Sequence, residues 1–279
     1  MLFGAHVSIA GGLTNAPQNA AEIGCEVFQM FTRSPQGGWV PELDAKTAAE
    51  FQANCKKAKQ KEWYVHTPYF INFASSEPRV KHASITVVRE ELERASMLGA
   101  KYLMTHLGSY ATLGRAKGFK QTVEALETML DGYKGKTKFL IEISAGAGGI
   151  IGGAFEEIAE IIYHPKLKKY DIGVCFDTQH AFASGYDLRT AKAVGATLKK
   201  FDSIIGLDKL KMSHCNDSRT EFGSHNDKHA HIGQGFIGAD GFRAIIADRR
   251  LKNINLILET RGAEAADDLV ILKKMRGDK

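Results

Sequence analysis

Side chains that can bind metal ions follow a series of short apolar runs along the chain. In GVCFDTQH (173–180) the apolar run ends at Asp177, and His180 follows three residues later. A carboxylate at the end of a buried strand is costly unless a proton, a cation or a metal ion offsets its charge. Other apolar runs end in the same way. The six residues at such ends are His66, His106, Glu142, Asp177, His214 and Glu259.

Each of these residues has an ordinary explanation when it is taken alone. An isolated histidine at a strand end is most often structural, and an isolated Asp or Glu is most often solvated or caps the next helix. Six such residues at equivalent positions would need six independent explanations. We therefore interpret them as parts of one site.

A second group of candidate ligands lies in the segment HNDKHAHIGQG (225–235). Asp227 and His229 are two residues apart, so they share one side of an extended segment. His180 could reach the same ion from the neighbouring loop. His231 has the same spacing from His229, and the pattern alone does not exclude it.

The residue types indicate which metal ions the site would bind. Imidazole and carboxylate ligands favour Zn²⁺ or Mn²⁺ over Mg²⁺ or Ca²⁺. The candidates are too many for one tetrahedral ion and suit two or three ions that share a carboxylate. They are the histidines His66, His106, His180, His214 and His229 and the carboxylates Glu142, Asp177, Asp227 and Glu259.

The apolar runs are expected to be β-strands separated by helices. The predicted strands span residues 2–8, 26–32, 62–67, 101–106, 138–143, 172–177, 209–214 and 254–259. The predicted helices span residues 44–60, 80–100, 118–133, 155–164 and 188–205. Repeats of about 35 residues without a linker predict an α/β fold in one domain, residues 1–279, closed as a (β/α)₈ barrel. An open doubly wound sheet is the main alternative.

A barrel would bring the candidate ligands together. The C-terminal ends of barrel strands converge on one face, where the following loops build active sites. Alternation along the strand then places Met104 and Tyr102 inside the barrel with His106, and Leu103 beneath the helices. The connections after His106 and from Cys215 to about residue 238 are unusually long, which is typical of functional loops.

The composition is that of an ordinary globular protein, with 44% hydrophobic residues and a formal charge of +5. This mild basicity permits a polyanionic partner without requiring one. The four scattered cysteines indicate reduced thiols, and the N-terminus does not resemble a signal peptide. We therefore expect a cytoplasmic protein with no membrane segment, which needs no obligate protein partner and is a monomer.

Three segments carry a resemblance to a known family. HLGSY (106–110), GVCFDTQHAFASGYD (173–187) and HCNDSRTEFGSHNDKHAHIGQGFIG (214–238) resemble the signatures of the endonuclease IV family of apurinic/apyrimidinic (AP) endonucleases. GAHVSIAGGL at the start and LILET near the end agree, so the resemblance covers essentially the whole chain. It implies a barrel with three metal ions, usually zinc. It also implies damaged double-stranded DNA as the partner, cleaved on the 5′ side of abasic sites, and repair of blocked 3′ ends.

The resemblance also assigns the ligands and leaves His231 outside the metal site. Glu142 would bridge the first two ions and help to hold the nucleophilic hydroxide. The first ion would be held by His66, His106 and Glu142, the second by Glu142, Asp177, His214 and Glu259, and the third by His180, Asp227 and His229.

The sequence departs from the family pattern at several positions. Gln179 stands where the family often has Cys, and Leu107 stands where Pro is common; we expect altered packing there. In FTRSPQGGW (31–39), residues 36–38 read Gln-Gly-Gly where family members can place an arginine that enters the lesion. Arg33 lies earlier in this loop and is a weaker candidate for that contact. In HTPYF (66–70), Tyr69 matches an aromatic residue that enters the minor groove, and Phe70 lies beside it.

Two other functions compete with the nuclease. A metal-dependent sugar isomerase would share the barrel and the strand-end ligands, but it would not explain the Asp-Lys-His segment at 227–229. A damaged-DNA-binding protein that retains zinc without catalysis would bind the lesion and leave the strand intact.

Overall fold

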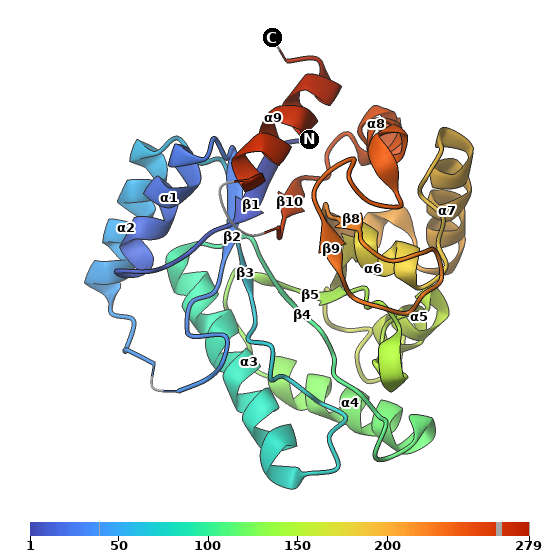
Figure 1. The fold of residues 1–279 in the computed structure, drawn as a ribbon. Coiled ribbons are helices and arrows are strands. Elements are labelled where there is room, and N and C mark those ends of the chain that lie inside the picture. Colours follow the sequence, from blue (N-terminus) through green and yellow to red (C-terminus); the bar gives the residue numbers. More distant parts are fainter. Residues whose placement is uncertain (39, 261–263, 279) are drawn as a thin grey trace.

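The computed structural model describes residues 1–38, 40–260 and 264–278, and its main sheet is a closed parallel barrel (Figure 1). The barrel strands are β1 (Phe3–His6), β2 (Val27–Met30), β3 (Trp63–His66), β4 (Tyr102–Thr105), β5 (Lys138–Glu142), β6 (Gly173–Asp177), β7 (Leu210–His214) and β10 (Leu256–Leu258). Strand β1 pairs in parallel with both β2 and β10, so the sheet closes on itself. The predicted (β/α)₈ barrel is confirmed, and the open sheet is excluded.

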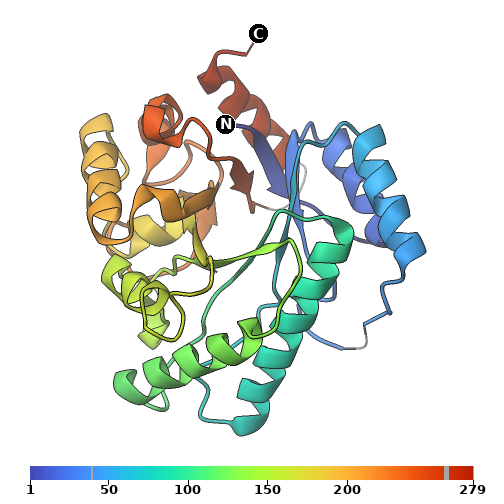
Figure 2. The same ribbon diagram turned by 180° about the vertical axis from the view of Figure 1, so that it is seen from behind.

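Helices form a ring around the barrel (Figures 1 and 2). They are α1 (Ala16–Glu22), α2 (Ala45–Lys57), α3 (Pro78–Leu98), α4 (Arg115–Leu130), α5 (Phe155–Ile162), α6 (Thr178–Ala183), α7 (Ala191–Ile204), α8 (Gly238–Ala247) and α9 (Glu264–Arg276). Short 3₁₀ turns span Leu13–Asn15, Ala147–Gly149, Leu207–Lys209 and Arg249–Leu251. Each of the five predicted helices overlaps an observed one.

Local sequence signals set several of the helix ends. The Asp44 side chain accepts a hydrogen bond from the backbone N–H of Thr47 at 2.7 Å and so caps the start of α2. Thr190 caps α7 in the same way, by accepting from the N–H of Ala193. Gly99 caps the C-terminal end of helix α3. Its φ of 74° is a left-handed conformation that residues with a side chain rarely adopt.

The barrel interior holds an apolar layer, formed by the buried side chains of Val27, Tyr64, Tyr102, Met104, Leu140, Cys175, Met212 and Ile257. Leu103 belongs instead to the core that lies between the strands and the helices. The predicted alternation along β4 is therefore confirmed. Because side chains on one face of a strand repeat every two residues, the next inward position lies two residues further on. This next inward position is Glu142 on β5, Asp177 on β6 and His214 on β7.

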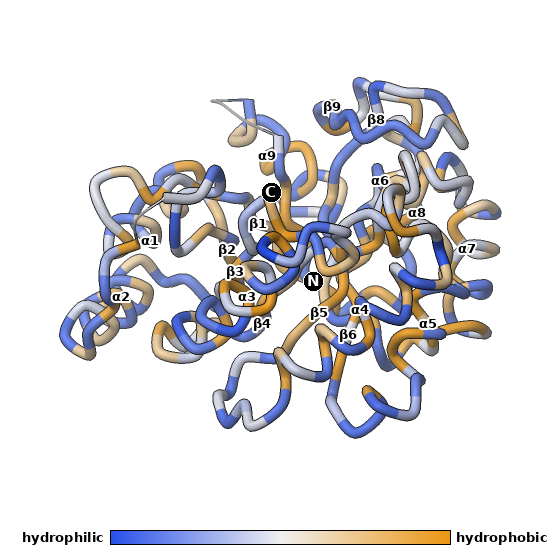
Figure 3. The backbone as a smooth tube through the Cα atoms, turned by 90° about the horizontal axis from the view of Figure 1, so that it is seen from below, coloured by the Kyte–Doolittle hydropathy of each residue, from blue (hydrophilic) through white to orange (hydrophobic). Residues whose placement is uncertain are grey.

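Hydrophobic residues concentrate in the central strands, whereas most of the peripheral loops are hydrophilic (Figure 3). The long loop after β7 contains a small antiparallel ladder of β8 (Asp217–Ser218) and β9 (His229–Ala230). No helix in the described part of the chain is long and apolar enough to cross a membrane. The four cysteines are buried and free of disulfide bonds.

Candidate metal centre

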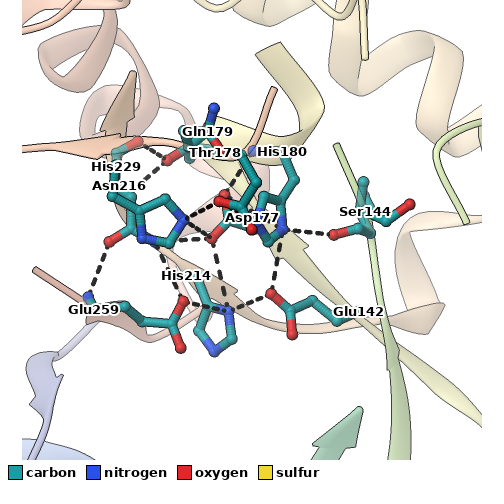
Figure 4. A network of polar contacts seen from close by, with 12 residues as sticks. Glu142, Ser144, Asp177, Thr178, Gln179, His180, His214, Asn216, His229 and Glu259 are labelled. Carbon is teal, nitrogen blue, oxygen red and sulfur yellow. Dashed lines mark hydrogen bonds and ion pairs between the residues drawn. The ribbon is translucent and has the colours of Figure 1, made fainter. Parts of the chain in front are cut away.

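All nine predicted ligands meet at the C-terminal end of the barrel strands, and Figure 4 shows most of them at close range. The ligand atoms of eight of them form three overlapping groups, and within each group the atoms lie no more than 4.8 Å apart. Asp227, the ninth, lies beside the third group. The groups are His66 with His106 and Glu142; Glu142 with Asp177, His214 and Glu259; and Asp177 with His180 and His229.

Glu142 lies at the centre of the cluster and is fully buried. Its Oε2 is 2.9 Å from His66 Nε2 and 3.3 Å from His106 Nε2. Its Oε1 faces the other way and lies 2.9 Å from His214 Nδ1 and 3.3 Å from His180 Nδ1. One carboxylate thus presents its two oxygens to different histidine pairs, an arrangement that allows it to be shared between two ions.

The second group combines side chains from β6, β7 and the end of β10. His214 Nδ1 lies 3.7 Å from Asp177 Oδ2 and 3.3 Å from Glu259 Oε2. Asp177 has a second role, because its Oδ1 accepts a hydrogen bond from the backbone N–H of His180 at 2.7 Å and caps α6. The metal-ligand and helix-cap interpretations of this carboxylate are therefore compatible.

The third group differs in detail from the prediction. His180 lies on helix α6 and not in a loop, because the Asp177 cap starts a helix directly after β6. Asp227 Oδ1 lies 3.2 Å from His180 Nε2 and 3.3 Å from His229 Nε2, so the three predicted side chains do meet. Asp177 lies close to both histidines and joins this group. Asp227 is the most exposed of the nine candidates, with a side chain 57% accessible.

The buried carboxylates of the cluster need positive charge close to them. Burial by itself raises the pKa of Glu142, but the charges of His106 and His214 lower it well below its ordinary value. Burial lowers the pKa of His180, whereas the charge of Asp177 and the neighbouring carboxylates raise it well above its ordinary value. Protons on the imidazoles, or bound cations, can supply the charge that these buried carboxylates need.

The donor set also fits a metal ion. Imidazole nitrogens and carboxylate oxygens are the ligands of zinc and of related transition metals. His229 Nε2 is buried and makes no hydrogen bond among the described residues, although Asp227 Oδ1 and Asp177 Oδ2 lie 3.3 and 3.9 Å away. A buried nitrogen without a hydrogen bond is costly, and metal coordination would satisfy it.

Two buried amides in the site escaped the sequence analysis. Gln29, on β2, contacts both Glu259 and His214. Asn216 donates to Asp177 Oδ2 at 2.8 Å and accepts from the backbone N–H of Glu259 at 2.9 Å. Alternation along β2 could have revealed Gln29, since it lies two residues beyond the inward-facing Val27. Neutral amides were not considered as metal ligands, which is why both were missed.

Comparison with known proteins places this chain in a family. The family described as "Xylose isomerase-like TIM barrel" matches residues 17–275. A protein described as "Probable endonuclease 4" from Halothermothrix orenii is 39% identical over 280 residues, which cover 100% of both chains. The crystal structure of endonuclease IV from Thermus thermophilus matches with a TM-score of 0.87 at 32% identity, over 99% of this chain and 98% of that one. The chain belongs to the endonuclease 4 family.

The fold of this endonuclease 4 family member extends to proteins of other chemistry. A D-tagatose 3-epimerase-like protein matches with a TM-score of 0.74 over 99% of this chain and 97% of that one, at 20% identity. At that identity the likeness concerns the barrel alone.

The structure shows the surroundings of Gln179, which departs from the pattern of the endonuclease 4 family, and of His231. Gln179, where we expected only altered packing, is fully buried and donates from its amide to the carbonyl oxygen of Asn226 at 2.8 Å. Asn226 directly precedes Asp227, so Gln179 anchors the loop that carries the third group. His231, which the spacing left open, lies outside the three groups. Its Nδ1 is 2.7 Å from Asp268 Oδ2 on α9.

A cleft of about 1170 Å³ lies over the metal centre. Tyr69 lines this cleft with 59% of its surface exposed, and its ring meets that of Phe31 edge to face at 5.3 Å. Phe70 beside it is 38% exposed. Both side chains remain predicted DNA contacts, and their exposure is what such contacts require.

Arg33 has a different setting from the one expected of a DNA contact. It is only 8% exposed, and its guanidinium lies 2.6 Å from Glu91 and 2.9 Å from Glu90. The charge of Arg33 is therefore paired within the protein. Arg33 also lines the cleft, so its assignment as a lesion contact stays a prediction, which this pairing disfavours.

Proposed function

We propose that this chain, as one domain of residues 1–279, is a metal-dependent AP endonuclease of base excision repair. Its reaction is hydrolysis of the phosphodiester on the 5′ side of an abasic site, which leaves a 3′-hydroxyl and a 5′-deoxyribose phosphate. Removal of blocking groups from 3′ ends would use the same site. The observation that carries the proposal is the central Glu142, whose two oxygens face different groups of ligands below the cleft. Membership of the endonuclease 4 family supports it.

Three ions, which we propose to be Zn²⁺ with Mn²⁺ as an alternative at some positions, would be held by the nine clustered side chains. The first ion would take His66, His106 and Glu142, the second Glu142, Asp177, His214 and Glu259, and the third His180, Asp227 and His229.

The arrangement suits hydrolysis of a phosphodiester, whose anionic oxygens repel hydroxide. Bound dications lower the pKa of a coordinated water molecule and neutralise charge on the phosphate and on the leaving oxygen. Glu142 would fix the separation of the first two ligand groups, because a single buried carboxylate serves both. Asp227 and His229 are partly exposed beside the cleft, so the phosphate would approach the cluster from their side.

Damaged double-stranded DNA would bind over this centre. Tyr69 and Phe70 are exposed aromatic side chains that could enter a widened minor groove. An abasic nucleotide has no base to unstack, so its extrusion into the cleft costs little free energy. The charge of +5 becomes more positive when dications bind, which favours association with the phosphate backbone. The monomeric state and the cytoplasmic location stay predictions.

The direct test is incision of an end-labelled duplex that carries one abasic-site analogue. Purified protein should cut 5′ of the lesion, lose this activity after chelation and regain it when Zn²⁺ is restored. Glu142→Gln should abolish incision, because the central ligand loses its charge. Glu157→Gln is the matched control: Glu157 is also buried, but it accepts a hydrogen bond from Gly152 outside the metal groups.

Each competing function predicts a different result in the same assay. Lesion binding without incision by the fully metallated protein would show a damage-binding protein. Absence of both binding and incision, together with turnover of an aldose or a ketose, would show a sugar isomerase. Either result would contradict the proposed nuclease.

A further inference from the structure

A buried glutamine at the end of β2 connects two of the candidate metal ligands. Gln29 has no exposed surface. Its amide nitrogen lies 2.8 Å from Glu259 Oε1 and 2.9 Å from His6 Nδ1. Its amide oxygen lies 2.7 Å from His214 Nε2. One side chain therefore makes three short polar contacts, two of them with ligands of the second group.

Glu259 fixes the orientation of the Gln29 amide. An ionised carboxylate can only accept hydrogen bonds, so the amide nitrogen must be the atom that faces Glu259. The amide oxygen then faces His214, and because a carbonyl oxygen can only accept, His214 must donate from Nε2. The hydrogen-bond partners thus assign both the amide orientation and the position of a ring proton.

This assignment determines which nitrogen of His214 is available to a metal ion. With the proton on Nε2, a neutral His214 carries its lone pair on Nδ1. The Nδ1 atom is the one that faces the cluster, at 2.9 Å from Glu142 Oε1 and 3.3 Å from Glu259 Oε2. Gln29 similarly occupies Glu259 Oε1 and leaves Oε2 directed at the cluster.

We propose that Gln29 is a positioning residue for the second metal ion. It holds His214 in the tautomer that presents Nδ1 and holds Glu259 with Oε2 toward the ion. The proposal rests on the metal centre of the proposed function. Partners that orient a ligand in this way typically change metal affinity about 10- to 100-fold when they are removed.

The test compares two buried glutamines in the metal-loaded protein. Gln29→Met keeps a similar side-chain volume and removes the polar contacts. Gln60→Met is the matched control, because the Gln60 amide is buried and donates to the carbonyl of Cys25 outside the metal groups. Competition with a chromophoric chelator should show Zn²⁺ bound about 10- to 100-fold more weakly in Gln29→Met than in wild type and Gln60→Met. Equal affinities in the three proteins would overturn the proposal.

A spectroscopic measurement separates positioning from general loosening of the fold. In the zinc-loaded wild type, long-range ¹H–¹⁵N correlation spectra should show His214 protonated at Nε2, with slow exchange of that proton. Gln60→Met should preserve this slow exchange, whereas Gln29→Met should lose it, because methionine offers no acceptor oxygen to Nε2. If Gln29→Met does not fold, the position of the His214 ring proton in the wild type still tests the assignment. A His214 protonated at Nδ1 in the wild type would overturn it.

Incision of abasic DNA is measured on the same samples, so a failure of the proposed nuclease function can be distinguished from a failure of the proposed role of Gln29. A wild-type protein that binds zinc without incising DNA would contradict the nuclease, while a lower zinc affinity of Gln29→Met would still support its positioning role. Normal incision by the wild type with equal zinc affinity in both variants would contradict only the role of Gln29.

Discussion

At the scale of single residues, the exposed Tyr69 is where we expect contact with the lesion. Tyr69→Ala should weaken binding of an abasic duplex by about 1–3 kcal/mol, as loss of an aromatic contact with nucleic acid does. The effect should appear mainly in KM, because Tyr69 is outside the ligand groups. Tyr163→Ala is the control, since Tyr163 is 50% exposed and lies outside the cleft lining. Equal lesion affinities of the two variants would contradict the assignment.

We expect Arg33 to stabilise the fold through its ion pairs with Glu90 and Glu91. Arg33→Ala should lower the free energy of unfolding by about 3 kcal/mol, because it leaves the buried Glu91 with a weaker partner, Arg94, at 3.6 Å. Chemical denaturation measures this loss, and lesion affinity at low temperature should stay unchanged. The double variant with Glu91→Leu should recover part of the lost stability. Unchanged stability together with reduced lesion binding would show instead that Arg33 contacts the DNA.

At the scale of structural elements, the loop after β7 is held by a buried carboxylate. Asp217 accepts hydrogen bonds from the backbone N–H groups of Gly233, Gly235 and Ile237 at 2.9–3.0 Å. Asp217→Ala should free this loop, increase amide hydrogen exchange over residues 225–238 and lower the zinc content from three ions toward two. Asp240→Ala, at a highly exposed position on α8, should change neither quantity. Full zinc content in Asp217→Ala would contradict this role of Asp217.

The sequence predicted most of the elements that carry the site, for a simple physical reason. Apolar runs that end in a ligand-type side chain mark barrel strands, and the two-residue repeat identifies the inward face. Helix α6 was missed because it has only six residues, too few for a helical pattern, and its signal is the Asp177 cap. Alternation along β2 places Gln29 on the inward face, but its contacts with Glu259 and His214, like those of Asn216 with Asp177, join segments far apart in the sequence. No local pattern reports such contacts.

At the scale of the whole molecule, an ion pair connects the C-terminal helix α9 to the start of the barrel. Arg276 lies 2.9 Å from Glu26, which also accepts a hydrogen bond from the backbone N–H of Phe3. Burial raises the pKa of Glu26, but the hydrogen bond from Arg276 and the other contacts lower it below its ordinary value of 4.5. The folded-state pKa is thus depressed. The stabilisation is present above the unfolded-state pKa and is lost as the pH falls through the folded-state pKa.

Glu26→Gln should therefore reduce the free energy of unfolding near pH 7 by less than about 1 kcal/mol, because the pair is partly exposed. The difference from wild type should shrink as the pH falls below 4.5. Urea denaturation near neutral pH and again well below that value measures both differences, with any metal contribution common to the two proteins. A difference that is constant between the two pH values would contradict the assignment.

The three proposed ions at one end of the barrel would act together on a phosphodiester. Metal-free protein should be titrated with Zn²⁺ while incision of the abasic duplex is followed at each added equivalent. We predict that 5′ incision reaches its full rate only when three equivalents are bound. Full incision with a single bound equivalent, or none with three, would contradict the account.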